Sequence, residues 1–245
     1  MHKIFRNAGR IGLILIVLAL AYLLYYFKPL PATEPALAAM HSSTGVTVST
    51  DSNTITFQPA KQATTGYIFY PGALVDPDAY AYYMHNLAEH QIATFIVKMP
   101  FGFALFDNER AASIIAAHPE IKHWVLGGHS LGGVSASIFT AEHANQVQGL
   151  VLYASYPASN ISQQLPHTRV LSISGSQDGL ATPAKIKVNK PLLPANTQYV
   201  VIQGSIHSYF GEYGHQSGDG DPKISRDDAR TQILNHTLSF LQQIQ

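Results

Sequence analysis

The segment VLGGHSLGG, residues 125–133, holds one serine among closely spaced glycines. Within it, Gly128-His129-Ser130-Leu131-Gly132 fits G-x-S-x-G, which forms a nucleophile elbow where a buried strand turns sharply into a helix. Glycines two residues before and after the serine avoid collisions in that turn, and the helix N-terminus favours a developing oxyanion. The segment predicts Ser130 as a nucleophile. The alternative is a glycine-rich turn with an idle serine.

A nucleophilic serine needs a histidine base, and the base needs an acid that orients it. The expected chain order behind an elbow is serine, acid, histidine. Asp178 follows a predicted strand in SGSQDG, although an ordinary Asp-Gly turn would look the same. His207 follows the last predicted strand in QGSIHSYFG. Because carboxyl ends of parallel strands meet at one edge of a sheet, we expect Ser130, Asp178 and His207 to form a catalytic triad.

Two backbone N–H groups would complete the site as an oxyanion hole. The Leu131 N–H is one candidate, since it follows the serine. The loop after YIFYPG should supply the other, near Ala73 or Leu74, because Pro71 has no N–H to donate. The pattern therefore predicts an oxyanion hole from Leu131 and Ala73, with Leu74 in the substrate pocket.

Residues 208–224 form the longest stretch of the domain without helix or strand periodicity, directly after His207. A loop of this length in a compact domain is usually functional or disordered. Tyr209, Phe210 and Tyr213 are too apolar for a disordered segment, so we expect them to pack against the site and form a pocket wall. His129 is likewise expected to pack behind the serine or to line the pocket.

The elements that must position these residues alternate between strands and helices. This order predicts an α/β fold with a doubly wound, mostly parallel sheet, and one catalytic domain over residues 45–245. An N-terminal β-hairpin, residues 46–59, adds antiparallel strands at one edge. The expected strands are 66–72, 92–100, 123–128, 147–157, 169–176 and 197–205, and the expected helices are 77–91, 107–117, 131–143, 182–188 and one that begins at Ser225.

The N-terminus predicts a membrane anchor. Residues 11–27 carry no charge and no proline, and as a helix they would span about 25 Å. Lys3, Arg6 and Arg10 precede them, which keeps residues 1–10 in the cytoplasm and places the catalytic domain outside it. Secretion after cleavage near Ala38 is the alternative. Residues 28–44, with several prolines and small residues, are predicted to be a linker.

The composition excludes several other functions. Lys plus Arg and Asp plus Glu are both 15, and basic residues do not cluster with aromatic ones, so no nucleic-acid partner is expected. Cysteine is absent, which excludes thiol nucleophiles, disulfides and thiolate metal sites. The histidine spacings do not match helical zinc sites, and Asp219 with Asp221 lacks the full ligand spacing of a calcium loop. We predict neither a metal nor a cofactor.

Four segments, YPGALVDPDAY, GGHSLGG, SGSQDG and IHSYFGEYGHQSGDGDPKIS, resemble a bacterial, dienelactone-hydrolase-like branch of the α/β-hydrolase superfamily. The resemblance covers residues 45–245, and members of this branch are often membrane-anchored. It implies the α/β-hydrolase fold, with Ser130 as nucleophile, Asp178 as acid and His207 as base. True dienelactone hydrolases usually carry a cysteine nucleophile. Since this chain has none, their substrate is not transferred to it.

Only residues 158–168 separate YASYP from the next predicted strand, so no lid domain is inserted there. An open site of this kind suits small or exposed esters. We therefore expect a membrane-anchored serine hydrolase that cleaves small-molecule carboxylic esters through an acyl-enzyme. The alternatives are an acyltransferase with the same triad, or a surface binding protein that keeps the fold without catalysis.

Overall fold

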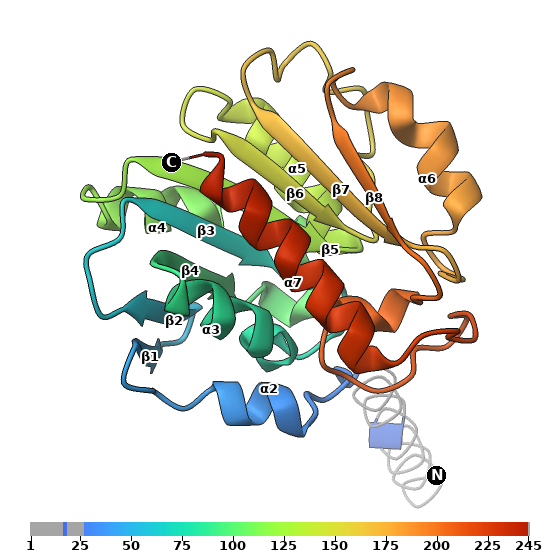
Figure 1. The fold of residues 1–245 in the computed structure, drawn as a ribbon, viewed down its shortest axis with the longest axis horizontal. Coiled ribbons are helices and arrows are strands. Elements are labelled where there is room, and N and C mark those ends of the chain that lie inside the picture. The colour runs from blue at the N-terminus through green and yellow to red at the C-terminus, as the bar shows by residue number, and fades with distance from the viewer. Residues whose placement is uncertain (1–16, 19–26, 245) are drawn as a thin grey trace, which may run out of the picture.

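The computed structural model describes residues 17–18 and 27–244. One eight-stranded sheet runs through them in the order β1-β2-β4-β3-β5-β6-β7-β8 (Figure 1). The β1–β2 and β2–β4 pairs are antiparallel and the remaining pairs are parallel, which confirms the predicted hairpin and mostly parallel sheet. The strands are β1 (Val46–Thr50), β2 (Thr54–Pro59), β3 (Thr65–Tyr70), β4 (Ile92–Val97), β5 (His123–His129), β6 (Gly149–Tyr153), β7 (Arg169–Gly175) and β8 (Gln198–Ile202).

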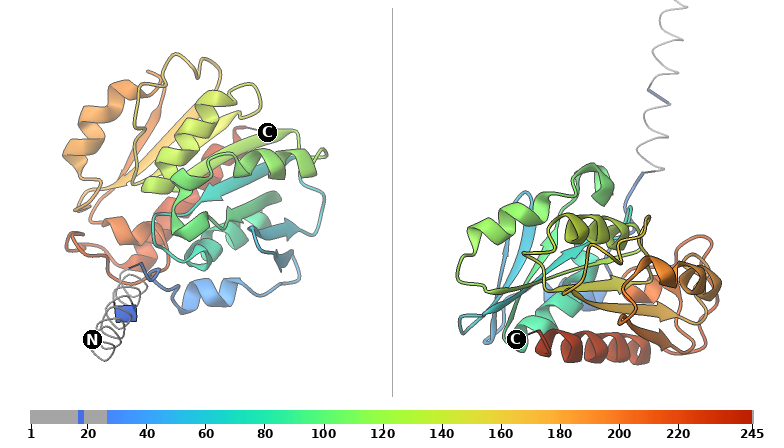
Figure 2. Two further views of the ribbon diagram at one scale, coloured as in Figure 1. Left: turned by 180° about the vertical axis from the view of Figure 1, so that it is seen from behind. Right: turned by 90° about the horizontal axis from the view of Figure 1, so that it is seen from above.

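Helices cover both faces of this sheet (Figure 2). Helices α3 and α7 bury their apolar side chains in a cluster on one face, and α4 and α5 do so on the other. β3 and β4 are buried along their whole length, which explains their uninterrupted apolar sequences. The helices are α2 (Glu34–Ala39), α3 (Ala81–Glu89), α4 (Arg110–Ala117), α5 (Leu131–Glu142), α6 (Pro183–Asn189) and α7 (Arg226–Gln242). Short 3₁₀ turns are η1 (Pro77–Tyr80), η2 (Pro100–Gly102), η3 (Ala104–Phe106), η4 (Lys190–Leu192) and η5 (His207–Phe210).

The last helix begins where its sequence predicts. The Ser225 hydroxyl oxygen accepts a hydrogen bond from the Asp228 N–H at 3.1 Å and donates its own proton to the Asp228 carboxylate at 2.7 Å. This cap fixes the next residue, Arg226, whose guanidinium donates to the carbonyls of Ser208, Gly211 and Tyr213. Helix α7 thereby holds the loop that follows β8.

Residues 30–43, here called the N-terminal strap, differ from the linker expected over 28–44. Leu30 donates its N–H to the Leu74 carbonyl at 2.7 Å, and Thr33 donates to the Glu212 carbonyl at 2.8 Å. Helix α2 buries Ala36 completely. Prolines and small residues are typical of both linkers and short docked segments, and only the contacts with distant loops distinguish the two.

Most of the expected membrane anchor, residues 11–27, lies outside the described residues, which include only 17, 18 and 27 of it. Among the helices of the described part of the chain, none is long and apolar enough to cross a membrane. The region between β6 and β7 contains no helix or strand, in agreement with the absence of an inserted lid.

An ion pair with a buried carboxylate connects α7 to the loop after β8, which also contacts the strap. The Glu212 side chain is fully buried and accepts from the Arg230 guanidinium at 3.2 Å. Arg230 also donates to Asp227 at 2.8 Å, but the Asp227 side chain is 80% exposed. Of the two carboxylates that Arg230 contacts, only that of Glu212 is inaccessible to water.

We expect Arg230→Met to lower the free energy of unfolding by about 3–5 kcal/mol, because it leaves the buried Glu212 carboxylate without its cation. Asp227→Asn, which removes the exposed partner of the same arginine, should cost no more than about 1 kcal/mol. Urea denaturation of both variants measures the difference. Equal losses would contradict the importance of the Glu212 pair.

Candidate active site

Ser130 occupies the turn between β5 and α5 with φ 52° and ψ −122°, a conformation that non-glycine residues rarely adopt. Two hydrogen bonds hold it there. The Ser130 N–H donates to the Tyr153 carbonyl at 3.0 Å, and the Ser155 hydroxyl donates to the Ser130 carbonyl at 2.7 Å. The strained strand-to-helix turn predicted from G-x-S-x-G is therefore confirmed.

The glycines on either side of Ser130 make this turn sterically feasible. A Cβ atom on Gly128 would lie 2.4 Å from the Gly132 carbonyl carbon. A Cβ atom on Gly132 would lie 2.1 Å from the Tyr70 carbonyl oxygen and 2.3 Å from that of Pro71. Both distances are far below van der Waals contact, so the elbow and the end of β3 fit together only with glycine.

His207 and Asp178 meet in the interior, as their positions after β8 and β7 predict. The His207 Nδ1 and Asp178 Oδ2 atoms are 2.9 Å apart, and both side chains are buried. The other Asp178 oxygen, Oδ1, accepts from the Leu180 N–H at 2.8 Å and the Ala181 N–H at 2.7 Å. With Asp178 ionised, Nδ1 carries the proton, and the lone pair of the imidazole lies on Nε2.

Asp219 organises the two loops that carry His207 and Asp178. Its carboxylate accepts from the backbone N–H groups of His207 at 2.9 Å and of Gly179, next to Asp178, at 3.3 Å. Burial raises the pKa of Asp219, but four backbone hydrogen bonds outweigh it and hold the pKa below its ordinary value. Within the described residues, no three metal-ligating side chains form a group that could hold an ion.

His129 packs directly behind the base. Its ring centroid lies 4.5 Å from that of His207, and its Nδ1 lies 2.9 Å from the Tyr80 hydroxyl. The same hydroxyl accepts from the Gly72 N–H at 3.0 Å, which connects the elbow to the loop after β3. Burial, together with the neighbouring charge of His207, holds the pKa of His129 well below its ordinary value. His129 is therefore neutral at physiological pH.

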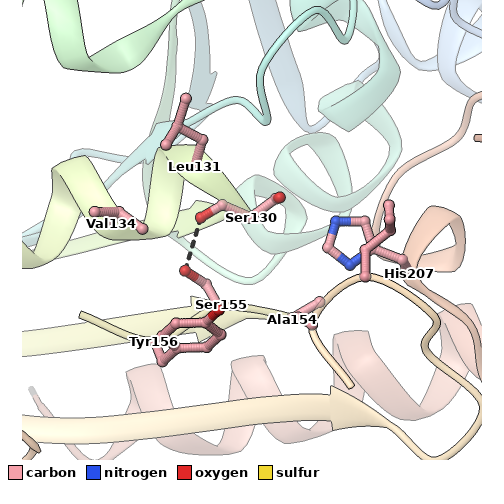
Figure 3. Close-up of a pocket in the computed structure, with 9 residues that line it drawn as sticks. Ser130, Leu131, Val134, Ala154, Ser155, Tyr156 and His207 are labelled. Carbon is pink, nitrogen blue, oxygen red and sulfur yellow. Dashed lines mark hydrogen bonds between the residues drawn. The ribbon is translucent and has the colours of Figure 1, made fainter. Parts of the chain in front are cut away.

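A pocket of about 220 Å³ opens beside the serine. Figure 3 shows the Ser130 hydroxyl directed across it towards the His207 ring. The lining residues are Ser130, Leu131, Val134, Ala154, Ser155, Tyr156, Leu180, Ala181 and His207. Among the described residues, no hydrogen-bond partner occupies the buried His207 Nε2 atom. A serine hydroxyl and a histidine acceptor in one open pocket fit nucleophilic attack with proton transfer.

The expected pocket wall is located elsewhere. Phe210 and Tyr213 are fully buried and pack against the His129 ring, and Tyr209 packs beneath the Arg226 guanidinium. These aromatic side chains, with His129, support the site from behind but do not line the pocket, and neither does Leu74. Their apolar character predicted burial, but it did not show which neighbours the rings would contact.

The pocket wall instead comes from residues that no sequence pattern singles out. Ala154, Ser155 and Tyr156 follow β6, and Leu180 with Ala181 follows Asp178 in the loop after β7. The signal that selected Asp178 and His207, a position just beyond the carboxyl end of a parallel strand, applies equally to these residues. Ala154, Leu180 and Ala181 carry no polar side-chain group, and the hydroxyls of Ser155 and Tyr156 belong to no catalytic motif in the sequence.

The two expected oxyanion donors lie at the start of α5 and in the loop after β3. Leu131 is the first residue of α5, so its N–H has no acceptor within that helix. Ala73 is half-buried in the loop after β3, and no hydrogen bond from its N–H occurs in the described part of the chain. The contact of Gly132 with Tyr70 and Pro71 keeps the helix start and this loop close together.

Comparison with known proteins agrees with this architecture. A family model described as "Alpha/beta hydrolase family" matches residues 66–231, more than half of the chain. The chain belongs to the alpha/beta hydrolase family. No curated protein matches this alpha/beta hydrolase by sequence.

Solved structures resemble the alpha/beta hydrolase in fold. Dienelactone hydrolase from Anabaena variabilis is 17% identical, with a TM-score of 0.59, 82% of this chain covered and 99% of that one. Esterase 2 from Thermogutta terrifontis is 14% identical, with a TM-score of 0.60 and coverage of 83% and 96%. Est1E from Butyrivibrio proteoclasticus, solved with ferulic acid, is 12% identical, with a TM-score of 0.60 and coverage of 83% and 97%. At these identities the likeness establishes the fold alone.

We expect Gly132→Ala to destabilise the protein by about 1–3 kcal/mol, because the added methyl group overpacks the contact with β3. Alanine is otherwise the better helix former, so the sign of the change tests the contact. Gly214→Ala is the matched control, since a Cβ there meets nothing within 4 Å. Chemical denaturation of both variants measures the effect, and a Gly132→Ala protein as stable as wild type would contradict it.

His129 also predicts a dependence of stability on pH. The unfolded chain protonates this histidine near pH 6.5, whereas the folded protein keeps it neutral. The free energy of unfolding should therefore be insensitive to His129 above that pH and fall below it, by up to about 1.4 kcal/mol per pH unit. Denaturation of wild type and His129→Asn from about pH 7 to about pH 5 isolates this contribution. Parallel pH curves would show that His129 does not resist protonation.

Proposed function

We propose that this alpha/beta hydrolase is a serine hydrolase that cleaves carboxylic esters, with Ser130 as nucleophile, His207 as general base and Asp178 as the acid that orients it. The observation that carries the proposal is the hydrogen bond of 2.9 Å between His207 Nδ1 and Asp178. This bond holds the proton on Nδ1 and leaves the lone pair on Nε2. His207 and Ser130 line the same pocket, so this lone pair can accept the serine proton.

In the proposed reaction, the Ser130 oxygen attacks the ester carbonyl carbon while His207 Nε2 accepts the hydroxyl proton. The carbonyl C–O bond to the alcohol then breaks, and the alcohol leaves with the proton from His207. Water repeats the sequence on the acyl-enzyme, with its proton again passing to His207, and releases the carboxylic acid with Ser130 restored. Asp178 stays ionised throughout and stabilises the histidine when it is positively charged.

The negative charge that develops on the carbonyl oxygen needs donors that are in place beforehand. We assign this role to the N–H groups of Leu131 and Ala73. The dipole of α5, whose N-terminus begins at Leu131, adds to the stabilisation. The carbonyl end of an acyl group would fit against Val134, Ala154 and Leu180, in a pocket that measures about 220 Å³.

We further propose that residues 11–27 anchor the protein in the membrane uncleaved, with the catalytic domain outside the cytoplasm. The strap supports retention of the N-terminus. Cleavage near Ala38 would remove Leu30, Thr33 and Ala36, which make backbone pairs with the site loops or are fully buried. Protease added to intact cells should degrade the catalytic domain. Complete protection until the cells are lysed would rule out this orientation.

Ser130→Ala should reduce ester turnover by roughly 10³-fold or more and abolish labelling by a fluorophosphonate probe, because both reactions require the serine oxygen. Ser113→Ala, which alters a serine of α4 remote from the pocket, should keep wild-type labelling and turnover. Nitrophenyl acetate hydrolysis and gel fluorescence measure the two effects. Normal turnover by Ser130→Ala would place the nucleophile elsewhere.

The same assay separates the alternative functions. An acyltransferase would label at Ser130 but pass its acyl group to an added alcohol or amine faster than to water. A binding protein that retains the fold without catalysis would neither label nor turn over any ester. Either result would replace the proposed hydrolysis.

A further inference from the structure

An exposed apolar surface lies beside the strap. We define the aromatic patch as Phe27, Phe101, Phe103, Leu105 and Phe106. Phe101 is 87% exposed and Phe106 66% exposed. The rings contact one another edge to face: Phe101 with Phe106 at 6.2 Å, Phe103 with Phe106 at 5.7 Å, and Phe27 with Phe103 at 6.3 Å. The patch therefore joins the loop after β4 to Phe27, which lies just before the strap.

Folding of the domain does not explain this patch. Exposed phenylalanine rings bury little surface and contribute little to the core. Phe101 also has φ 53°, a left-handed conformation that costs energy in a residue with a side chain. Large contiguous apolar patches on a protein surface commonly mark an interaction site.

The chain itself indicates the occupant of the patch. Phe27 is the last residue of the apolar segment 11–27, and Tyr22, Tyr25 and Tyr26 precede it. Aromatic residues at the end of such a segment mark the boundary between hydrocarbon and water. The ring contact between Phe27 and Phe103 brings the loop after β4 to the level of that boundary. Exposed aromatic side chains at the boundary between hydrocarbon and water match a lipid bilayer interface as their partner.

The aromatic patch also adjoins the proposed catalytic machinery. The Leu74 N–H, one residue after Ala73, donates to the Gly102 carbonyl at 3.0 Å. The turn η3, which carries Phe106, packs against α5, whose first residues line the Ser130 pocket.

We propose that the aromatic patch inserts into the membrane interface beside the anchor and holds the Ser130 pocket at the bilayer surface. The substrates are then amphiphilic esters, whose long acyl or alkyl chain stays in the membrane while the ester group enters the open pocket. The substrate class rests on the proposed function of Ser130. The membrane contact rests on the patch alone.

Tryptophan fluorescence of the full-length protein in phosphatidylcholine–phosphatidylglycerol vesicles tests the contact. The one native tryptophan, Trp124, is 4% exposed and gives a constant background. Phe101→Trp should add a blue-shifted emission that brominated phosphatidylcholine quenches. Val188→Trp is the matched control, because Val188 is 73% exposed on α6 and lies outside the patch. Emission from Phe101→Trp that resists quenching as the control does would overturn the membrane contact. So would a blue shift without quenching, since protein would then cover the ring.

A double variant, Phe101→Ser with Phe106→Ser, tests the substrate class in the same vesicles. Hydrolysis of nitrophenyl palmitate in the bilayer should fall about tenfold or more, because two apolar side chains no longer hold the pocket at the interface. Hydrolysis of soluble nitrophenyl acetate should stay at the wild-type rate. No loss on either ester, or an equal loss on both, would overturn the assignment of amphiphilic esters.

The two experiments fail separately. If the wild type hydrolyses neither ester, the proposed function is wrong and the substrate class falls with it. Quenching of Phe101→Trp needs no catalysis, so it still decides whether the aromatic patch enters the membrane.

Discussion

The carbonyl oxygens of Tyr70 and Pro71 lie against the backbone of Gly132, where a Cβ atom would be only 2.1 and 2.3 Å away. This contact between the end of β3 and the first turn of α5 determines the spacing of the whole site. It brings the loop that carries Ala73 next to the helix start that presents the Leu131 N–H. Ser130, directly before this helix, has φ 52°, and its hydroxyl points into the pocket.

Behind this turn, the polar groups form a nearly closed hydrogen-bond network. Asp178 accepts from His207 and from two backbone N–H groups, while Asp219 holds the backbone of the loops that carry both residues. The His129 ring packs against that of His207 at a tilt of 45°, and its Nδ1 lies within hydrogen-bond distance of the Tyr80 hydroxyl. Because burial keeps His129 neutral, no second positive charge opposes the protonation of His207 during the proposed reaction. Of the two neighbouring histidines, His207 is therefore the one assigned to accept the proton of Ser130.

The strap and the loop after β4 connect the site to the surface around Phe27. The Leu74 carbonyl accepts from the Leu30 N–H, and the Leu74 N–H donates to the Gly102 carbonyl. The strap and the loop that carries the aromatic patch are therefore both hydrogen-bonded to Leu74, the residue next to Ala73. A docked strap, unlike a free linker, holds the proposed oxyanion loop in a defined orientation relative to residue 27, where the proposed membrane anchor ends.

The sequence by itself determined the order of strands and helices, the strained turn at Ser130 and the pairing of Asp178 with His207. These follow from local periodicity and from a general rule, that residues after parallel strands gather at one edge of the sheet. Only the tertiary structure decided that the strap docks, that Phe210 and Tyr213 lie behind His129, and that Ala154 and Leu180 line the pocket. Apolar composition predicts burial without direction, because the neighbour that a side chain covers is set by contacts between segments far apart in the chain.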